Sequence, residues 1–314
     1  MKSRILSGLS YALVTTILAG GCTGKTNQDN AHTGELKGNV KSFTESEYFV
    51  NEEIDKAEIE NLMEKGSYAY DAQGNILEYI SYDGQGDIIY KMIYTYDERG
   101  NMIEVASILP DKTLSEKETY IYNENNKVIE KHIYTSDNII DEKRVYTYDN
   151  KGILIKEMAY DKDGSVSEKI IFVYDDKGNE VERSYHNYDG STAKQTSIYD
   201  ERGYKIETVY YTSENGYEGK THFKYDDAGN EIEWRYYEAD DSFGKTIKMG
   251  YDDKGNRTEE TEYGADGSVR YKNICKYEYD EKGNWIRRQR FTQDSENQKL
   301  IPQSITERTI EYWN

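Results

Sequence analysis

Apolar and polar residues alternate along most of the chain, in short segments separated by turns rich in Asp and Gly. Eight to ten residues separate successive turns, and the segments between them are rich in Tyr, Ile, Val and Thr. Only two prolines occur, Pro110 and Pro302. Alternation over this length is typical of half-buried β-strands, and the segments are too short for most helices. The pattern therefore predicts an all-β protein made of antiparallel strands.

The segments belong to a repeat that begins with Tyr-Asp. Nine tyrosines, here called the key tyrosines, recur every 25 to 28 residues: Tyr70, Tyr96, Tyr122, Tyr148, Tyr174, Tyr199, Tyr225, Tyr251 and Tyr279. In eight copies Asp follows the key tyrosine and Gly stands four residues after it, whereas Asn123 and Asn126 take these places in the third copy. Asn is the non-glycine residue that best tolerates positive φ. The motif thus predicts a type I turn closed by a left-handed residue.

A second turn lies twelve residues after the key tyrosine, as in Tyr82-Asp83-Gly84-Gln85-Gly86. Each repeat is expected to form two strands, so the nine repeats predict a long antiparallel meander of about 18 or more strands. Sheets of so many strands seldom stay open and flat. We expect a single sheet that curls or coils, with a hollow shell as the alternative.

Two columns of residues share a face with the key tyrosines. An aliphatic column, from Leu77 to Ile286, stands seven residues after them, and an aromatic column, from Tyr68 to Tyr277, stands two residues before them. If the Tyr-Asp turn is symmetric, the two columns lie directly opposite each other across the hairpin. This face is the predicted core.

The other face carries a charge pattern. Most repeats have Glu eight residues after the key tyrosine and Lys five residues before it. Across the second turn, Glu78 is expected opposite Lys91, and Glu104 opposite Lys117. Such a ladder stabilises weakly but fixes register, because a slip of one residue would turn the charges into the core.

An aromatic column twelve residues after the key tyrosines provides the candidate binding residues. Its members are Tyr82, Tyr134, Tyr160, Tyr211, Tyr237, Tyr263 and Phe291. Parity places them on the charged face, about 9.5 Å apart from repeat to repeat. Exposed rings at this spacing could stack along an extended glycan. The favoured alternative is structural: a bulge turns the rings inward, or the rings clamp the second turn.

The first residues predict export. Lys2 and Arg4 precede an uncharged apolar stretch, Ile5 to Leu18, that is short for a membrane span. Leu18-Ala19-Gly20-Gly21-Cys22 resembles the lipobox of bacterial lipoproteins, with Ala19 where that pattern has a large aliphatic residue. The resemblance implies cleavage before Cys22 and a lipid on this cysteine. The alternative is an ordinary secretory signal that happens to contain a cysteine.

The chain divides into five expected parts. Residues 1–21 are a signal peptide, 22–35 the lipidated cysteine and a polar tether, and 36–67 N-terminal capping strands. The charged insertion 51–64 could hold a short helix. Residues 68–295 form the nine repeats, and 296–314 contain a closing strand at 304–313.

Charge and cysteine content limit the partners. Without residues 1–21 the chain keeps 38 basic and 60 acidic residues, a formal net charge of −22. This argues against nucleic acid and anionic membrane surfaces as partners. Cys275 is the only other cysteine, so no disulfide forms within one chain whose Cys22 is acylated. Cys275 is expected to be a buried free thiol.

No pattern in the sequence indicates catalysis, a cofactor or a metal. Nucleophile-elbow, zinc-protease and phosphate-loop motifs are absent from the sequence. His132, His186 and His222 occupy unrelated positions in their repeats. The loop that starts at Asp161 fails as an EF-hand because Phe172 stands at its twelfth place. A Glu column with Lys opposite is a poor match to one catalytic carboxylate pair.

The Tyr-Asp-x-x-Gly motif, from Tyr68 to about Phe291, resembles the YD repeats of the Rhs, insecticidal-toxin and teneurin group. That resemblance implies hairpins that spiral into a hollow β-shell, and YD repeats are sometimes described as carbohydrate-binding. Two features depart from the group: Gly-Asn stands where Gly-Arg-Leu is usual, and the repeat is longer. No segment resembles the toxin portions of the large members, so toxin delivery is not implied.

The sequence as a whole predicts a non-enzymatic cell-envelope lipoprotein that presents a repetitive β-surface to a polysaccharide or an envelope protein. Its N-terminal lipid would hold it in a membrane, expected to be the outer membrane, on a face that the sequence leaves open. The alternative is a structural or encapsulating shell, or an immunity partner of a secreted toxin.

Overall fold

A computed structural model of the chain describes residues 36–50, 59–294 and 299–314. The predicted signal peptide, Cys22 and most of the tether lie outside the described residues. The described part is all-β, and it contains no helix long and apolar enough to span a membrane.

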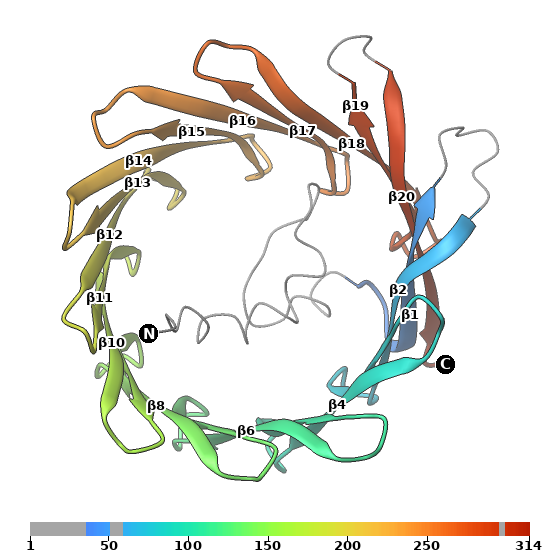
Figure 1. The fold of residues 1–314 in the computed structure, drawn as a ribbon, viewed down its shortest axis with the longest axis horizontal. Helices are drawn as coiled ribbons and strands as arrows, with labels where there is room; N and C mark the ends of the chain where they lie inside the picture. Colours follow the sequence, from blue (N-terminus) through green and yellow to red (C-terminus); the bar gives the residue numbers. More distant parts are fainter. Residues whose placement is uncertain (1–35, 51–58, 295–298) are drawn as a thin grey trace, which may run out of the picture.

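Twenty antiparallel strands follow one another around a ring (Figure 1). They are β1 (Val40–Val50), β2 (Ile59–Tyr70), β3 (Ile76–Tyr82), β4 (Ile88–Tyr96), β5 (Met102–Ile108), β6 (Leu114–Tyr122), β7 (Val128–Tyr134), β8 (Ile140–Tyr148), β9 (Leu154–Asp161), β10 (Val166–Tyr174), β11 (Glu180–Asn187), β12 (Thr192–Tyr199), β13 (Lys205–Thr212), β14 (Gly216–Tyr225), β15 (Glu231–Tyr237), β16 (Phe243–Tyr251), β17 (Arg257–Gly264), β18 (Val269–Tyr279), β19 (Trp285–Gln293) and β20 (Leu300–Tyr312).

The sheet closes on itself. β1 pairs with β2 on one side and with β20 on the other, from Val40 opposite Tyr312 to Phe49 opposite Ser304. The predicted antiparallel meander is confirmed. The expected curled or coiled sheet differs in detail, because the described strands form a closed barrel in which this pairing removes both free edges. Twenty tilted strands make a barrel about 40 Å across.

The Tyr-Asp turns have the predicted geometry. In the first, the Gly74 amide donates to the carbonyl of Asp71, and the Asp71 carboxylate accepts the amides of Gln73 and Asn75. Gly74 has φ +88°, and Asn126 holds the same left-handed conformation at +56°. The turns are therefore fixed by their own side chains, before any tertiary contact is made.

A bulge after each Tyr-Asp turn shifts the predicted register. Tyr96 pairs with Met102, but Thr95 pairs with Glu104, so Ile103 is an extra residue in its strand. As a result, Tyr94 lies opposite Val105 rather than Ile103. The predicted pairing of the aliphatic and aromatic columns is wrong for this reason: the aliphatic column occupies the bulges, and Leu77 within it is 42% exposed.

A second bulge, before the second turn, shifts the charge ladder. Glu78 pairs with Ile93, and Lys91 pairs with Ile80, so Glu78 and Lys91 are diagonal neighbours 3.7 Å apart and not directly opposed. In the next repeat Lys117 pairs with Ala106 and not with Glu104. The ladder thus exists in a different register from the one predicted.

The face of the key tyrosines is the inner face of the barrel. Most fully covered strand side chains lie on it, including Phe43, Tyr79, Phe172 and Met249. A curved sheet crowds side chains on its concave side and spreads them on its convex side. Leu36, ahead of β1, packs against the buried cluster of Val40, Phe43 and Tyr70. The Lys and Glu columns therefore lie on the outer face.

The two ends of the chain form the strands that close the barrel. The expected helix is wrong where it overlaps β2, which begins at Ile59; residues 51–58 lie outside the described part. The expected closing strand at 304–313 lies in β20, except for its last residue.

Candidate functional site

The aromatic column lies on the outer face, beside the second turns, and each ring meets a lysine. Lys65, Lys117, Lys143, Lys194 and Lys220 are the direct cross-strand partners of Tyr82, Tyr134, Tyr160, Tyr211 and Tyr237. Lysine nitrogens lie 4.6 Å from the ring centroid of Tyr134, 5.0 Å from that of Tyr82 and 5.5 Å from that of Tyr237. These distances are typical of cation–π contacts.

The six tyrosines of the column are half-buried, whereas Phe291 is only 1% exposed. Lys248 and Lys276 lie over Tyr263 and Phe291, at 5.4 Å and 5.0 Å from the ring centroids. The bulge therefore does not bring the tyrosines to the inner face. Their contacts with lysine agree with the expected alternative that the rings clamp the second turn. Part of each tyrosine nevertheless remains in water.

An apolar residue flanks most rings on the side away from the lysine. Ile88, Ile140, Val166, Phe243 and Val269 pair with Tyr82, Tyr134, Tyr160, Tyr237 and Tyr263 across the second turn. Each of these five is also among the exposed large apolar side chains. The unit that repeats along this part of the barrel is therefore a tyrosine between a lysine and an apolar side chain.

Ion pairs connect the lysines of the outer face to the Glu column. Lys143 and Glu130 lie 2.9 Å apart, as do Lys272 and Glu259, whereas Lys194 and Glu182 are 3.7 Å apart. At least one side chain of each pair is more than a third exposed. Exposed pairs contribute little to stability, so their main effect is on register.

The key tyrosines join neighbouring repeats. Their hydroxyls donate to the carbonyl of the first residue of the preceding odd-numbered strand, at 2.6 to 2.9 Å: Tyr96 to Ile76, Tyr122 to Met102, Tyr148 to Val128, Tyr199 to Glu180, Tyr225 to Lys205 and Tyr251 to Glu231. This contact, here called the tyrosine clamp, accounts for the repeated tyrosine without any ligand.

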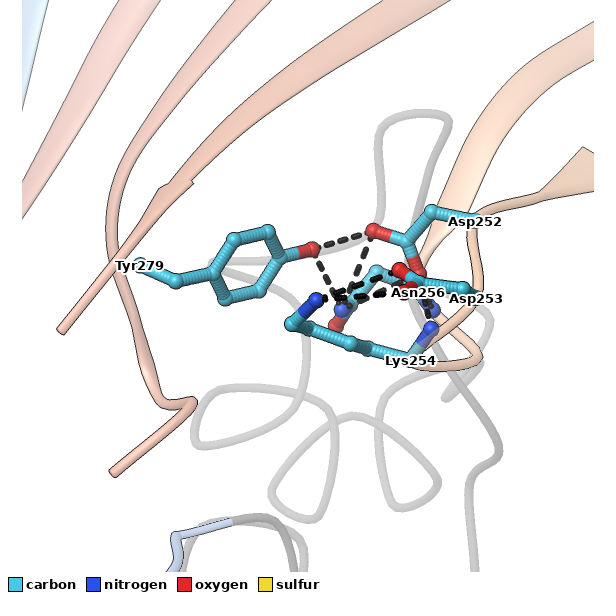
Figure 2. A network of polar contacts seen from close by, with 5 residues as sticks. All are labelled: Asp252, Asp253, Lys254, Asn256 and Tyr279. Carbon is cyan, nitrogen blue, oxygen red and sulfur yellow. Dashed lines mark hydrogen bonds and ion pairs between the residues drawn. The ribbon is translucent and has the colours of Figure 1, made fainter. Parts of the chain in front are cut away.

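The last key tyrosine makes a different contact (Figure 2). The Tyr279 hydroxyl donates to the Asp252 carboxylate and accepts from the Asn256 amide at 2.7 Å, while Lys254 lies 4.7 Å from the ring centroid. Partial burial alone would raise the pKa of Asp252, but hydrogen bonds from Tyr279 and from the turn amides lower it. Burial and the neighbouring Asp252 raise the pKa of Tyr279 well above its usual range. Tyr312 meets Asp280 and Asn284 in the same way.

Charged side chains on the inner face were missed by the sequence analysis. Lys131, 2% exposed, lies 2.8 Å from Glu118, and Arg144 reaches Glu142 and Glu157, each at 2.5 Å. Burial, and then nearby Arg144, lower the pKa of Lys131 to about 7 against the opposing effect of Glu142. The sequence does contain an indication of these inner charges. Glu118 and Arg144 stand four residues before their key tyrosines, in the column where other repeats have Met92 or Ile170.

The remaining reactive residues are also accounted for. Cys275 is buried, as expected. His132 and His222 contact Glu130 and Glu207, at 3.1 Å and 2.8 Å. Among the residues that the structure describes, no three His, Cys, Asp or Glu side chains are grouped to hold a metal ion.

Comparison with known proteins gives weak similarities. No family model and no curated protein matches the chain. A solved structure of TcdB2-TccC3-TEV is 12% identical over 77% of this chain, with a TM-score of 0.33, and the match spans only 16% of that chain. A porin-like protein from Bacteroides uniformis is 11% identical, with a TM-score of 0.39, and the match covers 88% of this chain and 98% of that one.

Proposed function

We propose that the protein is a non-enzymatic lipoprotein of the bacterial cell envelope that binds a glycan along the outer aromatic column. The observation that carries the proposal is the repeated unit of a half-buried tyrosine between a lysine and an apolar side chain. Flat aromatic rings offer sugars a stacking surface with a polar end that remains in water.

The geometry of the column suits an extended ligand. Equivalent rings are separated by two strands, or about 9.5 Å, which is comparable with the length of a disaccharide. Because a lysine already holds each ring, little side-chain freedom remains to be lost on binding. The lysine occupies one side of the ring, which leaves the rest of the exposed ring for a sugar.

The binding proposal is tested on the full chain in detergent. A variant that combines Tyr160→Ala, Tyr211→Ala and Tyr237→Ala should lose retention on a polysaccharide array. Its matched control carries Tyr→Phe at the same three positions and should be retained, because the rings remain. Thermal unfolding of both variants shows whether the barrel is intact. If the Ala variant is folded and its retention on the polysaccharide array is undiminished, the binding proposal is contradicted.

The envelope location rests on the lipid at Cys22, which would also provide the contact with a membrane. Wild-type chain expressed in a Gram-negative host should incorporate labelled fatty acid and sediment with outer-membrane fractions. The Cys22→Ser variant should do neither. Equal labelling of the two chains would contradict lipidation at this residue.

Closure of the barrel favours a second function, an encapsulating one. The pairing of β1 with β20 leaves no edge strand among the strands that the structure describes, and a barrel of more than sixteen strands is wide enough to enclose a lumen. Cysteines at Ser107, on the inner face, and Thr119, on the outer face, distinguish the two sides. An enclosed interior predicts that a polymer-linked maleimide labels Thr119→Cys much faster than Ser107→Cys, whereas a small maleimide labels both. Equal rates with the polymer would contradict a container.

A further inference from the structure

The outer face is divided into two sectors by its side chains. In the column three residues before the key tyrosine, the six earlier repeats have aliphatic or hydroxyl side chains, whereas the last three have basic ones. The earlier residues are Ser67, Ile93, Thr119, Val145, Ile171 and Thr196, and the later ones are His222, Lys248 and Lys276. These positions lie on the outer face, as the strand registers show. The later repeats therefore carry basic side chains in the middle of their strands, where the earlier repeats have aliphatic or hydroxyl ones.

Strands β14 to β19, the upper arc of the ring from gold to red in Figure 1, form what we call the basic sector. Its outer face carries Lys220, His222, Lys224, Arg235, Lys248, Lys272, Lys276 and Arg287, against three acidic residues, Glu233, Glu259 and Glu278. The whole chain has a formal net charge of −20. The excess of positive charge is thus local and opposite in sign to the rest of the protein.

Much of this positive charge is available to a ligand. Lys224 and Arg235 are 58% and 43% exposed, and both contact the single carboxylate of Glu233, at 2.9 Å and 2.8 Å. One carboxylate cannot neutralise two cations. Lys248 and Lys276 are also exposed, and each lies over an aromatic ring. Exposed cations are screened by salt and keep their attraction for an anion that comes into contact.

Two rings of the aromatic column lie within the sector. Tyr237 has Lys220 above it at 5.5 Å and the imidazole of His222 at 4.9 Å, measured to ring centroids. Tyr263 lies one repeat further on, beneath Lys248 at 5.4 Å. Stacking surfaces and cations therefore alternate along the same strip. Lys220 also forms an ion pair with Asp241 at 2.9 Å, and His222 contacts Glu207 at 2.8 Å.

We infer that the basic sector is the binding site for an acidic polysaccharide, with sugar rings on Tyr237 and Tyr263 and carboxylates on the lysines around them. This inference rests on the proposed glycan-binding function and specifies the class of glycan and its place on the barrel. The overall negative charge disfavours densely charged polymers such as nucleic acid. A uronic acid polymer carries one charge per sugar and offers a stacking face beside each charge.

The test uses the full chain in detergent, with polygalacturonate as the acidic probe and dextran as the neutral one. The wild-type chain should bind polygalacturonate in preference to dextran, and more weakly as salt rises. A variant with Lys224→Gln, Lys248→Gln and Lys276→Gln should bind polygalacturonate about tenfold more weakly or worse. The matched control, Lys127→Gln, Lys151→Gln and Lys156→Gln, removes the same charge from other repeats and should bind within about twofold of wild type.

Each remaining result decides against the inference. Equal weakening of the variant and the control would show an effect of net charge, and tighter binding of duplex DNA than of polygalacturonate would identify another class of ligand. The lysine variant could bind normally while the variant with Tyr160→Ala, Tyr211→Ala and Tyr237→Ala loses binding. In that case the assignment of the binding site to the basic sector is wrong, and the proposed glycan-binding function stands. If neither variant loses binding, or if wild type binds neither polymer, both are wrong.

Discussion

The repeats and the seam of the barrel are held together by different kinds of contact. Within the repeats, turns close over four residues, and tyrosine clamps reach 19 or 20 residues back along the chain. At the seam, where β20 meets β1, Arg308 binds Glu45 across 263 residues. The repeats can therefore form one after another, whereas the seam needs both ends of the chain in place.

The seam also has a composition of its own. Arg308 lies 3.4 Å from the Trp285 ring centroid and 2.7 Å from Glu45, and the Phe43 ring, 2% exposed, stacks on Tyr68 at 4.4 Å. The first key tyrosine, Tyr70, has a buried hydroxyl without a hydrogen-bond partner among the described residues. The tyrosine clamp, which recurs six times among the repeats, is thus replaced at the seam by a few contacts that occur once.

Among the substitutions that test this comparison, removal of the Arg308 side chain should have the largest effect on stability. Arg308→Ala leaves Glu45 without its partner and uncovers Trp285, so unfolding should become easier by about 3–5 kcal/mol, as for other buried ion pairs that lose one member. Arg202→Ala is the control within the repeats. Its side chain is 57% exposed, and the expected loss is below about 1 kcal/mol.

Urea unfolding of the two variants measures this difference, and small-angle X-ray scattering shows whether the ring has opened. Similar losses for both substitutions would mean that the seam is no more critical than any repeat.

The second prediction concerns the turns of the repeats. Gly100 has φ +81° and open space where a Cβ would lie, so Gly100→Ala tests backbone strain alone. The expected loss in the free energy of unfolding is about 1–2 kcal/mol. Gly100→Asn should cost less, because Asn126 already adopts this conformation at the same position of the next Tyr-Asp turn. Thermal unfolding ranks the three chains, and an Ala variant as stable as the Asn variant would contradict the strain argument.

The third prediction weakens one tyrosine clamp. Tyr122→Phe keeps the ring and removes the hydrogen bond to the Met102 carbonyl, 2.6 Å long, for an expected loss of about 1 kcal/mol. Tyr70→Phe, at the seam, is the matched control, because that hydroxyl has no partner among the described residues and its removal should be neutral or stabilising. Chemical unfolding of both variants is the measurement, and a larger loss for Tyr70→Phe would reverse the comparison.

Local features could be predicted from the sequence, and features that depend on one inserted residue or on distant partners could not. The turns were predictable because Asp71 and Gly74 determine their own conformation. The bulges were not, because Ile103 looks like any inward-facing strand residue. Because the bulges shift the register, the lysine–tyrosine contacts of the candidate site could not be predicted either. Closure depends on pairing between Val40 and Tyr312, which no repeat pattern contains.

The last prediction concerns pH at the seam. Glu64 lies directly opposite Glu47 on the inner face, and Glu45 stands two residues before Glu47 in β1. Partial burial, and then repulsion from Glu47 and Glu45, raise the pKa of Glu64 to about 7 from an ordinary value of 4.5. Tyr79 and Tyr90 from the next two strands also face Glu64, while Arg290 and Arg308 approach Glu47 and Glu45.

A carboxyl with a raised pKa binds its proton more tightly in the folded chain. Its stabilising effect is complete below about pH 4.5 and is lost as pH rises through about 7. Glu64 is partly exposed, so solvent screening reduces the effect to about 1 kcal/mol or less. Lys131, with its lowered pKa, acts in the opposite direction, so only a comparison of variants isolates Glu64. Relative to wild type, Glu64→Gln should gain stability at pH 8 but not at pH 5. An equal difference at both values would show that Glu64 does not titrate in this range.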